Sequence, residues 1–147
     1  VKKIIRVGSC GGMAPHLKVG DVVVAMSSAT DNAMSDKLAP GFTLSPCCDY
    51  QLLRKYMDTN PNANVGQIVS NDYFYQPDPD WYKPLTDLGV LAVEMETHVL
   101  YSLAAKHGKK ALSVNTVSDH LVTGEHMTSQ EREQGLGDMV ESILESL

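Results

Sequence analysis

Short apolar runs rich in β-branched residues recur along the chain and are separated by polar stretches. They cover residues 4–7, 22–25, 65–69, 90–93 and 111–117. Within each run the hydrophobicity is continuous rather than alternating, which is typical of strands covered on both faces. Their short length and the glycine and aspartate residues at their ends favour strands over buried helix segments. The pattern therefore predicts a parallel or mixed sheet with helices on each side.

Helix signals lie between these runs. Ser45 and Asp78 each precede a proline, an arrangement typical of an N-cap followed by the first helical position. Gly108 provides a C-terminal stop after a segment with one apolar face. Thr128 and Glu131 have the spacing of a capping box. The predicted helices cover residues 47–57, 79–89, 95–107 and 129–147.

Strand and helix alternate through most of the chain, which indicates an α/β fold. We expect a layered mixed sheet flanked by helices, formed by one domain over residues 1–147. Residues 30–45 are the longest irregular stretch, and a loop of this length is more often functional or mobile than a simple connection. A domain rarely begins in its own central sheet, yet Val1 lies directly before a buried strand. We therefore expect that N-terminal strands of the sheet are missing from this sequence.

The composition removes several classes of function. A formal net charge of −6 with 12 scattered Lys and Arg residues argues against a nucleic-acid partner. No run approaches the roughly 18 apolar residues that would span a membrane. The three cysteines lack CxxC spacing and the five histidines lack metal-site spacing, so we expect neither disulfides nor a metal. This cysteine usage fits a reducing cytoplasm, where we expect the protein to be located.

The first candidate for chemistry is the segment IIRVGSCGG, residues 4–12. A buried strand ends here in glycines, so backbone amides can approach a ligand closely. Arg6 is a fixed cation within the strand, and its fork of donors matches a phosphate. Ser9 adds a hydroxyl group. A glycine turn in which Arg6 forms an internal ion pair is an equally good interpretation of this segment alone.

Glu94 and Glu96 interrupt the apolar run LAVEMETHVL, residues 91–100. Residues two apart on a strand point to the same side, so both carboxylates would face one cavity. A carboxylate at a strand end is well placed to accept hydrogen bonds from vicinal hydroxyls, as on a ribose. Alternatively, Glu94 is a buried partner of Arg6, and Glu96 is a first-turn residue favoured by the helix dipole.

Asp119 lies in NTVSDHLVTGEH, residues 115–126, where a strand runs into a loop. Ligands of open α/β sheets bind beyond the carboxyl ends of strands, and a buried aspartate there can act as a general acid. Arg132, in the first turn of the last helix, is a candidate partner. A capping aspartate and an exposed arginine explain the local sequence equally well. A catalytic triad is excluded because Asp119 and His120, as neighbours on a strand, would point apart.

Tyr73, Phe74 and Tyr75 form an aromatic cluster in a chain that has only one Trp, six Tyr and two Phe. Such rings can stack on a planar ligand, although core packing is their commoner role. Both interpretations remain open for this cluster.

The order of these motifs along the chain is more specific than any of them alone. IIRVGSCGG, DYFY, VEMET, TVSDH and the ER pair of the last helix follow one another. In this order the chain resembles the hexameric bacterial-type purine nucleoside phosphorylases, and the resemblance covers essentially all 147 residues. VEMET with TVSDH is typical of the wider superfamily of nucleoside phosphorylases and nucleosidases, and Arg6 with Asp119 indicates its purine phosphorylase branch.

The resemblance implies phosphorolysis of purine nucleosides, with phosphate as co-substrate, no other cofactor, and a homohexameric assembly. By position, Arg6 and Ser9 would bind phosphate. Met95 and Glu96 would hold the ribose, with Glu96 accepting from its 2′ and 3′ hydroxyls. The residues implied to line the purine pocket are Phe74, Val93, Tyr75, Cys10 and Gly11.

By the same resemblance, Asp119 would donate a proton to N7 of the purine as the glycosidic bond breaks, assisted by Arg132. Glu94 would support the site from its edge. The two glutamates would then interrupt an apolar segment because the strand end forms the floor of a sugar pocket. The preferred purine is not readable, because an aspartate meets either a 6-amino or a 6-oxo group, depending on its protonation.

Three other functions remain alternatives. A nucleosidase of the same superfamily would use water in place of phosphate, but Arg6 argues against it because a hydrolase needs no cation there. Uridine phosphorylase matches less well at TVSDH, where a purine N7 needs an acid. A non-catalytic fragment would bind nucleosides without cleaving them, and the expected absence of N-terminal strands supports that alternative.

Overall fold

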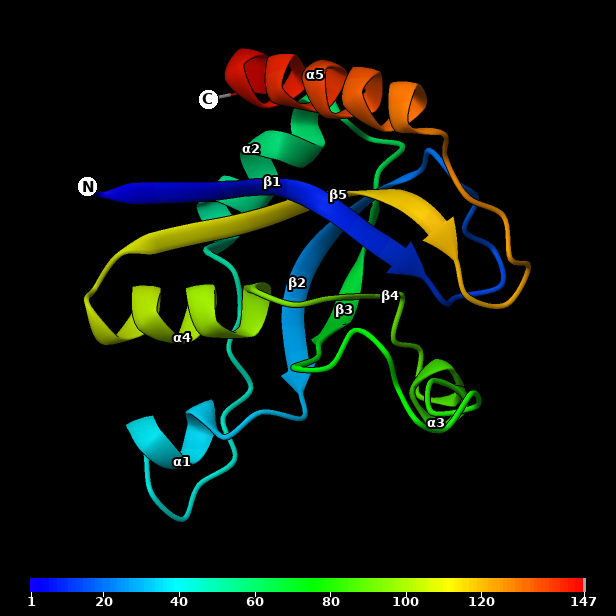
Figure 1. Cartoon of the computed structure of the whole chain (residues 1–147). Coiled ribbons are helices and arrows are strands. Elements are labelled where there is room, and N and C mark those ends of the chain that lie inside the picture. Colours follow the sequence, from blue (N-terminus) through cyan, green and yellow to red (C-terminus); the bar gives the residue numbers. More distant parts are fainter. Residues whose placement is uncertain (147) are drawn as a thin grey trace.

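The structure is a computed structural model that describes residues 1–146 (Figure 1). Its strands form one sheet that closes on itself in the order β1-β4-β3-β2-β5. The strands are β1 (Lys3–Gly12), β2 (Val22–Thr30), β3 (Asn64–Ser70), β4 (Ala92–Glu94) and β5 (Lys110–His120). The helices are α1 (Met34–Leu38), α2 (Tyr50–Thr59), α3 (Lys83–Asp87), α4 (Thr97–Lys106) and α5 (Ser129–Ser146). The predicted α/β class is confirmed.

The sheet is mixed, as the sequence predicts. β1 runs parallel to β5, and β3 runs parallel to both β2 and β4, whereas β1–β4 and β2–β5 are antiparallel pairs. The short strand β4 closes the sheet, because Val93 pairs with Gly11 of β1 on one side and with Val69 of β3 on the other. Closure depends on strand tilt and stagger, which the hydrophobic pattern does not encode.

β5 is buried over almost its whole length because other elements cover both of its faces. Leu112 and Val114 belong to a cluster that includes Met139 of α5 and residues of α2. Ala111 belongs to a second cluster, which includes Tyr101 of α4. Figure 1 shows α2 and α5 on one side of the β1–β5 pair and α4 on the other. The continuous apolar run of residues 111–117 is explained by this two-sided packing.

α2 begins later than the sequence indicates. Asp49, not Ser45, is its N-cap, and the Asp49 carboxylate accepts a hydrogen bond from the Leu52 amide at 3.0 Å. The residues before it are extended instead of helical, because Cys47 forms an antiparallel bridge with Ser27 of β2. Backbone pairing with the sheet therefore replaces the helical turn that the Ser-Pro pair predicts.

α3 and α4 also begin later than expected. α3 starts at Lys83, and Pro84 lies in its first turn, where proline is compatible with a helix start. α4 starts at Thr97, with Glu96 at the N-cap position. Residues 30–45, expected to be irregular, contain the five-residue helix α1. The differences at α3 and α4 concern where a helix begins, whereas α1 is a short helix that the sequence does not predict.

The start of α5 agrees with the predicted capping box. The Thr128 hydroxyl accepts from the Glu131 amide at 3.2 Å, and the Glu131 carboxylate accepts from the Thr128 amide at 2.8 Å. The two hydrogen bonds satisfy amides that the first helical turn leaves free. Among residues 1–146, no helix combines the length and the apolar character needed to cross a bilayer.

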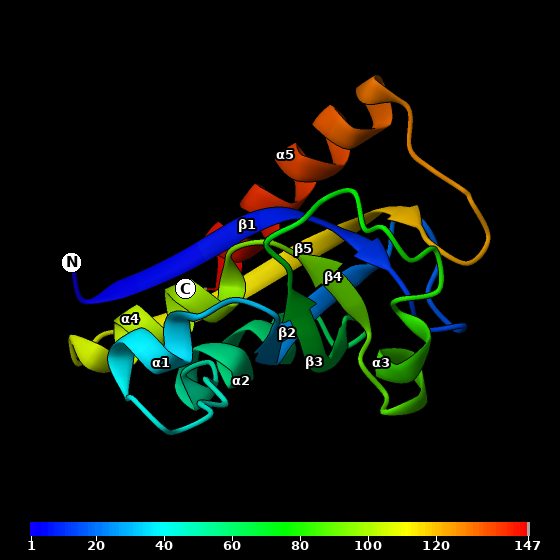
Figure 2. The same cartoon turned by 60° about the horizontal axis from the view of Figure 1, so that its bottom comes forward.

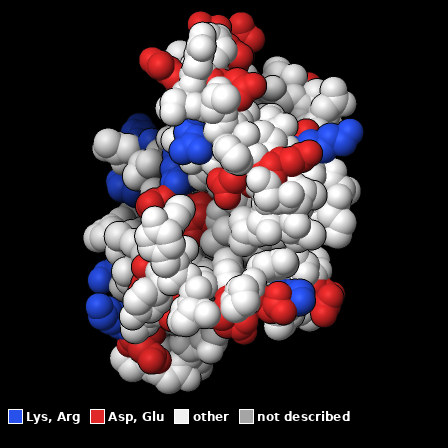
Figure 3. All heavy atoms as spheres, turned by 45° about the vertical axis from the view of Figure 1, so that its right-hand side comes forward, with Lys and Arg blue, Asp and Glu red and all other residues white. Residues whose placement is uncertain are grey.

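The elements leave the ends of β1 and β5 on one side of the molecule. Figures 1 and 2 both place these strand ends near α3, away from the N-terminus. On the face shown in Figure 3, acidic and basic side chains form separate small groups among larger uncharged areas. The strand ends therefore meet at a surface that is not dominated by one sign of charge.

Candidate functional site

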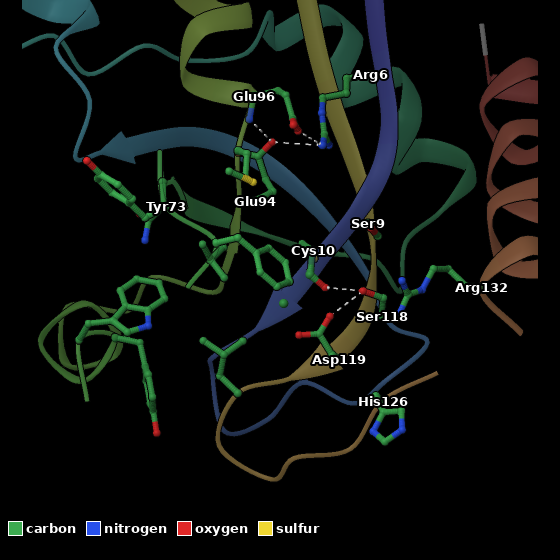
Figure 4. A pocket seen from close by; sticks show the side chains of 18 of the residues that line it. Arg6, Ser9, Cys10, Tyr73, Glu94, Glu96, Ser118, Asp119, His126 and Arg132 are labelled. Atoms are coloured by element: carbon green, nitrogen blue, oxygen red, sulfur yellow. Dashed lines mark hydrogen bonds and ion pairs between the residues drawn. The ribbon is translucent and has the colours of Figure 1, made fainter. Parts of the chain in front are cut away.

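A cavity of about 700 Å³ lies where β1, β4 and β5 come together (Figure 4). Its volume is within the range of pockets that bind small organic ligands. The predicted site residues that line it are Arg6, Ser9, Cys10, Gly11, Phe74, Val93, Met95, Glu96, Asp119 and Arg132. Of the predicted site residues, Tyr75 alone is not part of this lining.

Glu94 lies buried at one end of the cavity. Its side chain is only 1% exposed, and its carboxylate accepts from the amides of Glu96 at 3.0 Å and Thr97 at 2.9 Å. The Ser70 hydroxyl also donates to it, and Nη2 of Arg6 lies 3.4 Å away. Charge-assisted hydrogen bonds are stronger than those between neutral groups. Glu94 thereby joins the end of β4 to the first turn of α4 and to β1.

Arg6 connects the buried glutamate to the exposed one. Its guanidinium donates to the carboxylate of Glu96, whose side chain is 60% exposed, and to the side-chain oxygen of Asn115. The side chain of Arg6 is itself 18% exposed. The alternative in which Arg6 forms an internal ion pair is thus realised in this structure, and Arg6 still lines the cavity. Figure 4 shows Arg6, Glu94 and Glu96 gathered at this end of the pocket.

Glycine makes room for the guanidinium. A Cβ on Gly8 would lie 2.5 Å from Nη1 and 2.8 Å from Cζ of Arg6. Residues two apart on a strand face the same side, so Arg6 folds back over the space that a side chain at position 8 would fill. The glycines of the first motif therefore accommodate a side chain of the protein as well as any ligand.

A β-bulge places Asp119 at the other end of the cavity. In the β1–β5 ladder Cys10 pairs with Val117, and Gly11 pairs with Asp119, so Ser118 is an extra residue. Bulges re-aim side chains and are common near active sites. Here the Ser118 hydroxyl donates to Oδ1 of Asp119 at 2.8 Å. This contact between neighbours on a strand would not form in a regular ladder.

Arg132 approaches from α5 but does not reach Asp119. Within the described part of the chain the two residues form no ion pair, and Figure 4 shows Ser118 between them. A second cavity of about 290 Å³ lies beside the first, and Arg132 lines both of them together with Arg6 and Ser9. Arg132 thus adds a positive charge near Arg6 and Ser9, and the direct pairing considered from the sequence is absent here.

The aromatic segment forms a wall of the cavity. Phe74 lines it and meets the ring of Tyr75 edge to face, with centroids 5.0 Å apart. Tyr75 is 88% exposed and lies outside the lining, whereas Tyr73 and Trp81 are part of it. Residues 71–81 therefore contribute Tyr73, Phe74 and Trp81 to the lining of the cavity, and not Tyr75.

Cys10 is a neutral part of the pocket. Burial raises the pKa of its thiol far above the ordinary value, and the nearby carboxylates of Glu94 and Asp119 raise it further. The thiol consequently stays protonated and is a poor nucleophile. Cys10 is therefore suited to contact a ligand rather than to react with it.

His120 takes no part in the cavity. Its Nε2 lies 3.1 Å from the Ala14 carbonyl, and its Nδ1 accepts from the Val122 amide at 3.3 Å. These contacts anchor the loop after β5. In the region that the structure describes, no group of three or more His, Cys, Asp and Glu side chains is arranged to hold a metal ion.

Several lining residues were not predicted from the sequence. Asn71 directly follows β3, and Ser118 is the extra residue of the bulge in β5. Tyr82 comes from the turn before α3, and His126 comes from the loop after β5. The motif NTVSDHLVTGEH contains both Ser118 and His126, but only the bulge and the loop conformation bring them to the pocket. A strand-end polar residue such as Asn71 carries the same signal as Asp119 and was recognisable on that basis.

The fold and the cavity together define an α/β protein with a cavity at the ends of its strands, between paired charges and an aromatic wall. The sequence profile described as the Phosphorylase superfamily matches residues 1–146. The chain belongs to the phosphorylase superfamily, which confirms the resemblance inferred from the order of its motifs.

Curated relatives carry a more specific description. The chain is 46% identical over 150 aligned positions to proteins described as "Purine nucleoside phosphorylase DeoD-type" from Bacillus cereus, Bacillus thuringiensis and Bacillus mycoides. Each alignment covers 99% of this chain and 64% of the relative. The chain therefore spans a little under two thirds of the length of these proteins.

Proposed function

We propose that the protein catalyses phosphorolysis of purine ribonucleosides and deoxyribonucleosides, giving the free base and the sugar 1-phosphate. The observation that carries this proposal is the order of charges along one cavity. The cation Arg6 and the exposed carboxylate of Glu96 lie at one end, and the carboxyl group of Asp119 lies at the other. This arrangement matches, in the same order, the phosphate anion, the sugar and the base of the reaction.

Phosphate binds at the Arg6 end, where Arg6 and Ser9 line two adjoining cavities. Guanidinium groups donate paired hydrogen bonds to phosphate oxygens. Arg6 already contacts Glu94 and Glu96, and the buried Glu94 holds its guanidinium at a fixed place. When the sugar binds, Glu96 releases hydrogen-bond donors of Arg6, and these donors then bind phosphate.

The ribose binds between Met95 and Glu96. Glu96 is exposed and its side chain makes no capping hydrogen bond to α4, so its oxygens are available to the 2′ and 3′ hydroxyls. Met95 is 39% exposed and offers an apolar surface beside it. Glu96 is therefore hydrogen-bonded both without substrate, to Arg6, and with substrate, to the sugar hydroxyls.

The purine binds beside Asp119, with Phe74, Val93, Cys10 and Gly11 around it. Cleavage of the glycosidic bond leaves positive charge on the sugar and negative charge on the base. Phosphate and the Glu96 carboxylate stabilise the first, and a proton given by Asp119 to N7 neutralises the second. The bond between C1′ and the base breaks as a bond to a phosphate oxygen forms, so that no redox partner or cofactor is required.

Support for Arg132 as an assisting residue comes from its position rather than from a bond to Asp119. It lies behind Ser118, whose hydroxyl already contacts the aspartate. We keep Tyr75 only as a candidate for contact with the base. Its ring packs on that of Phe74, which lines the cavity.

We further propose that the protein works in the cytoplasm as a homo-oligomer, with a hexamer suggested by the motif resemblance. The free thiols of Cys10, Cys47 and Cys48 are compatible with a reducing compartment. Analytical ultracentrifugation of the purified chain measures the assembly directly. A single sedimenting species with the mass of one chain would contradict the oligomer.

The proposal is tested by measuring release of free base from inosine and adenosine, with and without phosphate. We expect release that requires phosphate and is strongly reduced in Asp119→Asn. Asp58→Asn, a change of an exposed aspartate on α2, is the matched control and should retain wild-type rates. Release in water alone would assign the protein to the nucleosidases. Nucleoside binding without release in either buffer would assign it to the non-catalytic alternative.

A further inference from the structure

The loop after β5 brings a histidine directly opposite the proposed acid. Asp119 and His126 form an antiparallel bridge, flanked by hydrogen bonds from the His120 amide to the Glu125 carbonyl at 2.8 Å and from the Met127 amide to the Ser118 carbonyl at 2.7 Å. Neither Asp119 nor His126 bonds to the other through its backbone, which is the pattern of a non-hydrogen-bonded pair. Side chains of such a pair lie on the same face, with Cβ atoms roughly 4.5–5.5 Å apart.

The register of this pair is set by a glycine turn. Gly124 has φ +74° and its amide donates to the His120 carbonyl at 2.9 Å. This left-handed conformation favours glycine, and it returns the chain so that residue 126 faces residue 119. Both side chains line the same cavity, and Figure 4 shows His126 at its edge, beyond Asp119.

The hydrogen bonding of the His126 ring fixes what it offers a ligand. Its Nδ1 lies 3.3 Å from the Gly124 carbonyl oxygen. A carbonyl oxygen only accepts hydrogen bonds, so Nδ1 carries the ring proton in this contact. In a neutral imidazole the other nitrogen, Nε2, is then an acceptor.

We propose that His126 selects for nucleosides of 6-aminopurines, an inference that rests on the proposed function. The 6-substituent of a purine is next to N7, the atom that Asp119 protonates, so the neighbouring side chain is placed to contact it. The Nε2 lone pair of His126 accepts a hydrogen bond from a 6-amino group, whereas the oxygen of a 6-oxo group presents a second acceptor and is repelled. The choice of purine that Asp119 leaves open is thus made by His126.

The test is the ratio of kcat/KM for adenosine to that for inosine, measured at about pH 8.5, where free imidazole is neutral. We expect His126→Ala to lower this ratio about 3- to 10-fold, the effect of one neutral hydrogen bond. His126→Phe keeps a ring but removes the acceptor and should lower it equally. His107→Ala, at an exposed histidine after α4, should leave the ratio unchanged. An unchanged ratio in both variants at position 126 would overturn the proposal.

A second readout separates this inference from the proposed function. Titration calorimetry gives the Kd of adenine and of hypoxanthine for the same variants without requiring turnover. If the wild-type chain releases no base but binds adenine more tightly, and His126→Ala removes that preference, phosphorolysis is wrong and the role of His126 stands. Equal affinity for the two bases in the wild-type protein would overturn the role of His126, whatever the outcome for phosphorolysis.

Discussion

Oδ2 of Asp119 lies 3.2 Å from the point that a Cβ on Gly11 would occupy. The two residues are partners in the β1–β5 ladder, directly after the bulge at Ser118. The same Cβ would be 2.6 Å from Cδ1 of Leu121. Glycine at position 11 therefore allows the carboxyl group of the proposed acid to lie close to the backbone of the neighbouring strand.

Gly11→Ala should consequently impair both catalysis and stability. The added methyl group displaces Leu121 and the Asp119 carboxyl group, and a misplacement of about 1 Å can reduce the rate about 100-fold. We expect kcat/KM for inosine to fall at least about tenfold, with a stability loss of about 1–3 kcal/mol from overpacking. Steady-state kinetics and thermal unfolding measure the two effects.

Gly137→Ala is the matched control for this substitution. Gly137 lies in α5, and a Cβ there meets no atom within 4 Å. It should stabilise the protein by about 0.5–1 kcal/mol through helix propensity and leave kcat/KM unchanged. Wild-type kinetics in Gly11→Ala would contradict the close approach of Asp119 to this strand.

Gly8→Ala should act on phosphate rather than on the nucleoside. A Cβ at this position collides with the guanidinium of Arg6, which can move aside only by weakening its contacts with Glu94 and Asn115. The shifted guanidinium then loses its paired geometry towards phosphate. We expect the KM for phosphate to rise about tenfold, the equivalent of about 1.4 kcal/mol, together with a fall in Tm from the weakened contact between Arg6 and Glu94. A rise in the KM for inosine alone would contradict this assignment of Arg6.

Glu94 is expected to be essential for stability, although it only supports the site. Glu94→Ala leaves the partly buried Arg6 and the amides of Glu96 and Thr97 without their buried acceptor. Removing one partner of a buried pair costs about 3–5 kcal/mol, and Glu94→Gln, which keeps one oxygen, should cost less. Urea unfolding measures the difference, with the exposed Glu133→Gln as control. A Glu94→Ala variant as stable as the control would contradict the central role of this carboxylate.

His98 should make stability depend on pH. Its ring is fully buried, neither ring nitrogen has a hydrogen-bond partner in the region described, and burial lowers its pKa below 6.5, opposed in part by the nearby backbone of Leu44. The unfolded chain therefore binds this proton at a higher pH than the folded chain. The stability that neutral His98 permits is present above about pH 6.5 and is lost as the pH falls below it.

Unfolding experiments between pH 7.5 and 5 test this dependence. The free energy of unfolding of the wild-type protein should decrease more steeply than that of His98→Leu, which has no proton to bind. His16→Asn changes an exposed histidine and should follow the wild-type curve. Parallel curves for the wild-type protein and His98→Leu would show that the ring titrates equally in both states.

The elements that the sequence predicts well are those whose signal is local. The strand at residues 111–117 was recognisable because packing on both faces requires a continuous apolar run, and the start of α5 was recognisable because a capping box is a contact within one turn. Ser45 failed as a helix cap because a bridge between Cys47 and Ser27 outweighs a local propensity. Long-range backbone pairing of this kind leaves no mark within a short window of sequence.

The residues of the candidate site likewise fall into those that the sequence reveals and those that it does not. Arg6, Glu96 and Asp119 were recognisable as candidates because a charged group within an apolar strand or directly after one is conspicuous. Ser118 and His126 were missed because their positions depend on a bulge and on a four-residue turn, both of which change the register between strands. The absence of a bond between Arg132 and Asp119 likewise depends on where α5 packs, which helix periodicity does not specify.

The central claim is that phosphate, rather than water, receives the sugar. Phosphorus-31 NMR of the purified chain with inosine and phosphate follows the fate of the sugar directly. The account predicts a sugar 1-phosphate resonance that grows in step with the hypoxanthine released and is lost in Arg6→Ala. Release of hypoxanthine with free ribose and no new phosphorus resonance would contradict it.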